Sequence, residues 1–221
     1  KVFYPVTRSG RFMEVKAYFE GKAKKEAQPH LEAASQKILE CESLDELEGI
    51  LADCATELLR IAGGEGGKDD IRNVLRGEDF TGDPVAELRA SVAAARGERP
   101  WTPALAVALA FRDTYDAVID RASYGGRHTL GGKDFDAFVS TLERVGFGPP
   151  VESAQIMLEL LDEGRIRTEL VARGEEDLRD LAKEIGATVI IDAVQAPPGI
   201  VEGTLVGNLV EAGIGLRYAD T

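Results

Sequence analysis

The chain has 221 residues, 44% of them hydrophobic and 29% charged, which suits one large globular domain or a domain with a lobe. Its net charge of −13 argues against binding to nucleic acids or anionic membranes, because an acidic surface repels phosphates. No apolar run approaches the roughly 20 residues that span a bilayer, and the start KVFYPVTRSG lacks a signal-peptide pattern. Two cysteines are too few for a disulfide framework, so we expect a reduced, cytoplasmic protein.

From residue 14 to residue 122 the pattern predicts helices. The clearest follows CESLDELEGILADCATELLRIAGG, where Ser43 and Glu46 form a capping box and Gly63-Gly64 end the helix. Its apolar residues recur every three or four positions, as on one buried helix face: Leu44, Leu47, Leu51, Cys54, Leu58 and Ile61. Shorter helices are expected over residues 30–40, 67–76 and 84–96.

A second long helix is expected to start near Thr102-Pro103 and to run through ALAVALAFRDTYDAVIDRAS. Its first half is apolar all round, so we expect it to be central. Three acidic residues lie opposite its later apolar residues and are interpreted as a solvated face rather than a metal site: Asp113, Asp116 and Asp120. GGKDFDAFVSTLERVG and VESAQIMLELLDEG are then predicted as two amphipathic helices.

The character of the sequence changes after Gly164. RIRTELVA is predicted as a strand, EEDLRDLAKEIG as a helix, and ATVIIDAV as a strand buried on both faces. Strand, helix and strand in about thirty residues is the length of a parallel βαβ unit. We therefore predict an α+β, mainly α-helical fold, with a helical, bundle-like domain over residues 1–165 and a small α/β segment over residues 166–221.

Few residues stand out as candidate sites. GGEGGKD departs from the phosphate-binding loop at both ends, and we interpret it as a plain connection between helices. His128, in the glycine-rich YGGRHTLGG, is either a surface residue or a proton-transfer group. Arg8 and Arg11, on either side of Gly10, are either exposed turn residues or contacts for an anion such as a phosphate. The GFGPP turn at residues 146–150 either ends one helix and starts the next, or lets a ligand approach closely.

Several stretches together resemble a family of bacterial FAD/NAD(P)-binding proteins. They are YPVTRSGR (4–11), GFGPPVESAQIMLELLDEGRI (146–166), VIIDAVQAPPGI and LVGNLVEAGI, in this order. The family has a flavoprotein-type dinucleotide fold with a largely helical region inserted into it. The resemblance covers the two ends and the third quarter of the chain, whereas residues 14–100 show nothing that matches.

The motifs and the resemblance together give two sets of predicted site residues. Those assigned to the cofactor are Arg8, Gly10 and Asp192. Those assigned to a small-molecule substrate are Gly148, Pro149, Pro150 and His128. The cofactors would be FAD and NAD(P), held by the parent flavoprotein of which this chain would be one part.

The chain departs from the family pattern in ways that affect this expectation. The Gly-x-Gly-x-x-Gly fingerprint that holds the pyrophosphate is absent, and the first residue is Lys1 rather than Met. Thr7 and Ser9 replace a common serine and histidine, and Val194-Gln195 replaces a common Thr-Gly. We therefore expect an internal fragment that is inactive alone and does not bind FAD by itself.

Two other classes of function remain open. One is a non-catalytic, acidic helical domain that binds a protein through an apolar groove. The other is a free-standing domain that binds a small molecule in a closed apolar pocket with convergent polar groups.

Overall fold

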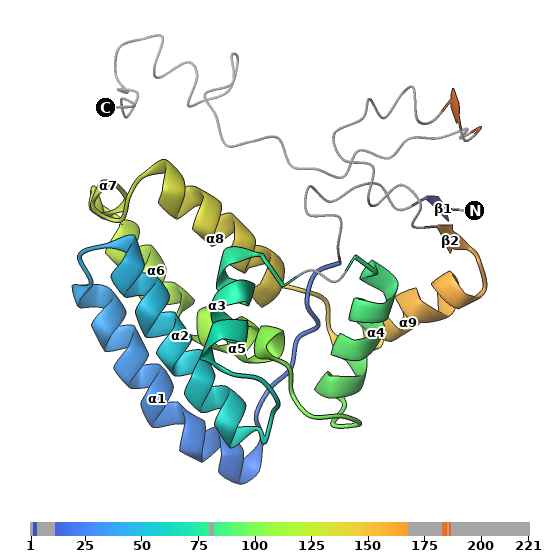
Figure 1. Cartoon of the computed structure of the whole chain (residues 1–221), viewed down its shortest axis with the longest axis horizontal. Coiled ribbons are helices and arrows are strands. Elements are labelled where there is room, and N and C mark those ends of the chain that lie inside the picture. Colours follow the sequence, from blue (N-terminus) through green and yellow to red (C-terminus); the bar gives the residue numbers. More distant parts are fainter. Residues whose placement is uncertain (1, 4–11, 80–81, 168–182, 185, 187–221) are drawn as a thin grey trace, which may run out of the picture. The chain divides into compact units, whose positions relative to one another are not determined.

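The computed structural model describes residues 2–3, 12–79, 82–167, 183–184 and 186 (Figure 1). The chain divides into two compact units, Lys1–Glu175 and Glu176–Thr221, and every element named below belongs to the first. The described residues form nine helices and a pair of two-residue strands, so the prediction of a mainly helical fold is confirmed. The elements are β1 (Val2–Phe3), α1 (Gly21–Glu40), α2 (Leu44–Ile61), α3 (Lys68–Arg76), α4 (Pro84–Ala95), α5 (Pro103–Asp113), α6 (Tyr115–Ala122), α7 (Gly126–Thr129), α8 (Lys133–Gly146), α9 (Val151–Asp162) and β2 (Ile166–Arg167).

Helix α5 is the centre of the main bundle. All residues from Ala104 to Phe111 are buried, as expected for a helix that is apolar all round. It packs against α2, α3, α6 and α8, while α1 packs against α2 and α6. Figure 1 shows this bundle beside a separate pair formed by α4 and α9. Within the described ranges, none of the helices combines the length and apolarity needed to cross a bilayer.

A non-helical stretch, residues 12–20, runs between the bundle and the α4–α9 pair; we call it the N-terminal segment. Val15 and Ala17 are buried whereas Tyr18 is exposed, a two-residue alternation typical of extended backbone. Val15 packs with residues of α4 and α9 in a second, smaller core. The prediction that the helical region starts at residue 14 is therefore wrong, and α1 begins at Gly21 rather than near residue 30.

The capping box of α2 is present in a modified form. The Ser43 hydroxyl accepts a hydrogen bond from the Glu46 backbone N–H at 3.2 Å, as predicted. The Glu46 carboxylate, however, accepts from the backbone N–H of Glu42 at 2.7 Å, one residue before the expected partner. Both bonds satisfy backbone donors at the start of the helix, so the boundary falls where the sequence predicts it.

The single long helix predicted from residue 102 is divided into α5 and α6 at Thr114. The buried Thr114 hydroxyl donates to the carbonyl of Ala110 at 2.8 Å, and the residue departs from helical geometry, with φ −108° and ψ 6°. A threonine bond to the carbonyl four residues back bends helices. The bend lets the Tyr115 ring pack edge-to-face against Phe111 and Phe147.

The predicted βαβ unit lies almost entirely outside the described residues. Of its first predicted strand, RIRTELVA, only Ile166 and Arg167 are seen as β2, and they pair in parallel with β1, Val2 opposite Ile166 and Phe3 opposite Arg167. The following predicted helix and the strand ATVIIDAV fall outside the described ranges, apart from isolated positions. The β1–β2 pair brings together segments from the two ends of the helical region.

Candidate functional site

The three residues assigned to the cofactor, Arg8, Gly10 and Asp192, lie outside the described residues. Their assignment stays a prediction, and the structure gives no geometry for it. The candidate site is therefore built from the described residues of the helical region.

Gly148 makes the close approach that its sequence context predicts, but to the protein's own backbone. A Cβ at this position would lie 1.5 Å from the carbonyl oxygen of Glu14 and 2.7 Å from its carbonyl carbon. The carbonyl of Pro149 accepts a hydrogen bond from Lys16 N–H at 2.9 Å. Pro150 is exposed at the start of α9. A substrate could reach this side of Gly148 only by displacing the N-terminal segment.

His128 lies apart from that turn. It is an exposed residue of α7, which precedes the start of α8. Gly148 follows the end of α8. The 14 residues of α8 span about 20 Å, so the structure does not bring His128 and Gly148 into one site. The neighbouring Arg127 guanidinium binds Asp136 and lowers the pKa of its carboxyl group.

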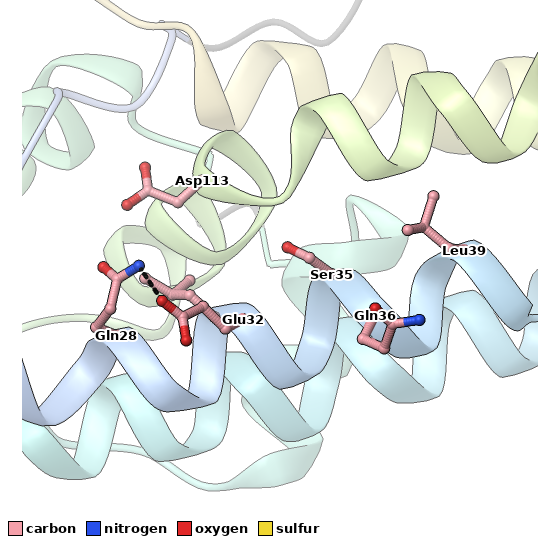
Figure 2. A pocket seen from close by; sticks show the side chains of 7 residues that line it. Gln28, Glu32, Ser35, Gln36, Leu39 and Asp113 are labelled. Atoms are coloured by element: carbon pink, nitrogen blue, oxygen red, sulfur yellow. Dashed lines mark hydrogen bonds between the residues drawn. The ribbon is translucent and has the colours of Figure 1, made fainter.

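A groove on α1 brings several polar side chains together, whereas the described residues among the predicted site residues do not form a common site. It has a volume of about 380 Å³ and is lined by one face of α1 together with the last residue of α5 (Figure 2). Its lining is Gln28, Leu31, Glu32, Ser35, Gln36, Leu39 and Asp113. We call it the α1 groove. Its α1 residues follow the three- and four-residue spacing that places side chains on one helix face.

The charge in the α1 groove is negative. Glu32 accepts a hydrogen bond from the Gln28 side-chain amide at 2.9 Å, and among the described residues it forms no ion pair. Partial burial raises the pKa of the Asp113 carboxyl group, a shift opposed by the neighbouring Arg112 and more weakly by Lys24. No basic side chain belongs to the lining.

The Arg112 side chain makes its closest contacts outside the α1 groove. Its Nη2 donates to the carbonyl of Ala17 at 2.8 Å, and its guanidinium carbon lies 4.4 Å from the centre of the Tyr18 ring. Its Nε lies 3.5 Å from an Asp113 carboxylate oxygen, beyond ordinary hydrogen-bond distance. The guanidinium therefore ties α5 to the N-terminal segment and only partly offsets the Asp113 charge.

A second hollow, of about 300 Å³, lies among α3, α4 and the start of α5. Three of its polar groups support the fold. Asp70 accepts from the Gly67 N–H at the start of α3, Ser91 from the Val15 N–H, and Thr102 from the Leu105 N–H at the start of α5. Asp79 and Glu87 add further acidic groups to its lining. This acidic hollow does not fit the diphosphate of a dinucleotide cofactor, and neither does the α1 groove.

The two cysteines do not suit a catalytic or metal-binding role. Both are buried and free. Burial raises the pKa of Cys54 to about 12 and also raises that of Cys41, so both thiols stay protonated at neutral pH. No group of His, Cys, Asp and Glu suited to hold a metal ion occurs within the part of the chain that the structure describes.

The α1 groove was not predicted from the sequence. Gln28 precedes the helix predicted over residues 30–40, and Asp113 was correctly placed on an exposed face without a neighbour. The repeat of Gln28, Glu32 and Gln36 at every fourth position was the signal available. No family model, no curated protein and no solved structure matches the chain, so its function has to be argued from these residues.

Proposed function

We propose that the helical region, residues 12–165, is a domain inserted into a FAD/NAD(P)-binding, oxidoreductase-like protein, where it covers the substrate side of the cofactor site. The observation that carries the proposal is that both ends of this region lie together. Phe12 and Val15, at its start, pack in one small core with Ala154 and Leu158 of α9, its last helix. A domain inserted into another fold needs its two connections close to each other.

The strand pair extends this argument. β1 precedes the helical region, β2 follows it, and the two pair in parallel. Parallel neighbours require a crossover connection, and here the helical region is that connection. The order of the motifs that resemble the FAD/NAD(P)-binding family supports the same arrangement, because in that family the helical region interrupts the dinucleotide fold.

In this proposal the described residues do not hold the cofactor. Both hollows are acidic, so FAD and NAD(P) would be bound by the rest of the parent flavoprotein together with Arg8, Gly10 and Asp192. The cofactor, when bound, supplies hydride transfer, while the protein binds and orients the substrate. The partners are the parent flavoprotein and a small-molecule substrate. The buried free thiols fit a cytoplasmic setting.

The test is the visible absorption spectrum of the full-length product of the gene that contains this sequence. We expect a flavin spectrum that NADH or NADPH bleaches in the absence of oxygen, whereas residues 1–221 alone remain colourless after incubation with FAD. A full-length product that is colourless and takes up no added FAD would overturn the proposal. So would a gene that encodes only these residues.

A second candidate is the acidic helical interaction domain. It is favoured by two large apolar side chains on helices that pack together, Leu39 of α1 and Ile119 of α6, which are 44% and 43% exposed. If the full-length product binds no flavin, a partner isolated with it that protects α1 from hydrogen exchange would support this candidate.

A further inference from the structure

The α1 groove has the length of a short helix. From Gln28 to Leu39 it follows α1 for about 16 Å, or three helical turns. Asp113 stands at the end of α5 on the opposite side from the α1 side chains (Figure 2). The lining therefore offers contacts at successive turns, as helix-binding grooves do.

The two ends of the groove differ in chemistry. Near its start, Glu32 and Asp113 contribute two carboxylates, and the cations closest to Asp113 do not line the groove. At its other end Leu39 is 44% exposed, whereas Leu31, next to Glu32 near the start, is buried. A ligand that satisfies both ends needs positive charge at one end and an apolar side chain at the other.

From this pattern we infer that the α1 groove docks a basic amphipathic helix of a partner protein. A lysine or arginine of that helix lies against Asp113 and Glu32, and an apolar side chain two turns away covers Leu39. A second copy of this chain does not fit, because its net charge of −13 repels an acidic groove. The inference does not depend on a flavin-binding parent.

Partial burial disfavours the ionised form of Asp113 in the groove, and a basic partner would offset this cost. The Asp113 side chain is 38% exposed, and the pKa of its carboxyl group is raised because burial outweighs the neighbouring positive charges. A cationic side chain at this position would stabilise the ionised form. The charge complementarity would set specificity and association rate, whereas contact with Leu39 would add apolar burial.

The probe is a fluorescently labelled synthetic peptide of about 14 lysine and leucine residues, arranged to place leucines on one face of a helix. Binding to residues 1–221 is followed by fluorescence anisotropy. A scrambled peptide of the same composition measures attraction that comes only from net charge. We expect the amphipathic peptide to bind and the scrambled peptide to bind at least about tenfold more weakly, because only the amphipathic order presents lysines and leucines at the spacing of the groove.

The decisive comparison uses two double variants with the same change in charge. Glu32→Gln with Asp113→Asn removes both carboxylates from the groove. Glu159→Gln with Asp116→Asn removes two exposed carboxylates that do not line it. We expect the first pair to weaken binding about fivefold to tenfold and the second to leave it within about twofold, since exposed ion pairs contribute little each. Equal effects of the two pairs, or no binding by the amphipathic peptide, would overturn the inference.

A third comparison tests the apolar end. Leu39→Ala should weaken peptide binding about threefold, because a half-exposed leucine loses its contact with the peptide. Ile156→Ala, at a position on α9 that is 56% exposed and outside the groove, should have no effect. Equal losses would count against the groove as the docking site. Circular dichroism checks that each variant remains folded.

Discussion

Alanine at position 148 should separate the N-terminal segment from the helical body. The added Cβ would lie 1.5 Å from the Glu14 carbonyl oxygen and 2.7 Å from the carbonyl carbon. Both atoms belong to the backbone, so no side-chain rotation relieves the collision. To reach an ordinary separation of about 3.5 Å, the two backbones must move apart by about 2 Å.

The cost follows from what that movement breaks. Two backbone hydrogen bonds join the segment to the last turn of α8 and the residues after it, Glu14 to Arg144 at 3.4 Å and Lys16 to Pro149 at 2.9 Å, and each contributes about 1 kcal/mol. The fully buried Val15 lies between them in the chain and would lose part of its burial. We therefore expect Gly148→Ala to lower the free energy of unfolding by about 3 kcal/mol, within the usual range for overpacking.

Urea unfolding followed by far-ultraviolet circular dichroism measures this change. The matched control is Gly49→Ala in α2, where a Cβ meets no atom within 4 Å. That variant should be more stable by about 0.5–1 kcal/mol, because alanine is the better helix former. If Gly148→Ala unfolds at the same urea concentration as the unaltered chain, the close approach is not a constraint and the reasoning fails.

Three further predictions concern the core, the buried thiols and the groove. Phe111→Ala should lower the free energy of unfolding by about 3–5 kcal/mol, because the ring is fully buried in the main core; an unchanged urea midpoint would contradict this. The thiols of Cys41 and Cys54 should react with an aromatic disulfide reagent only after unfolding, because burial raises both pKa values; rapid labelling of the native chain would show otherwise. Asp113→Asn should stabilise the chain at neutral pH by less than about 1 kcal/mol. The folded-state pKa of Asp113 lies above its unfolded value, so the native chain loses stability as the pH rises through it, and the advantage of the variant should disappear in acid.

Helices with local signals were predicted within a few residues. Ser43 accepts the bond that begins α2, Asp83 caps α4 before Pro84, and Gly164 follows α9 with φ +64°. Each signal acts within four residues of the boundary it sets, so the sequence around it is sufficient. The central position of α5 was equally clear, since only a helix covered on every side is apolar all round.

The N-terminal segment could not be predicted in this way. Val15 donates its backbone N–H to Ser91, 76 residues along the chain, and Lys16 donates to Pro149. These partners are distant in sequence and satisfy the backbone groups that a helix would otherwise satisfy internally. The bend at Thr114 combines a local signal, the bond to the Ala110 carbonyl, with a distant one, the packing of Tyr115 on Phe147 after α8.

The α1 groove depends on both kinds of information. Gln28 belongs to α1 only because the helix continues through Pro29 back to Gly21. Asp113 was correctly predicted to be exposed, but its place beside α1 follows from the packing of the bundle. Local pattern therefore identifies the residue types of the groove, whereas tertiary packing brings them together.

The most direct test of the central claim, that the helical region is an inserted domain, is the flavin content of the full-length parent with and without that region. Residues 12–165 are replaced by about six glycine and serine residues, which reach about 13 Å between the two connections. The proposal predicts that both proteins purify with bound FAD and that only the unaltered parent oxidises NAD(P)H in a substrate-dependent way. A parent without flavin, or a shortened protein that cannot fold, would contradict it.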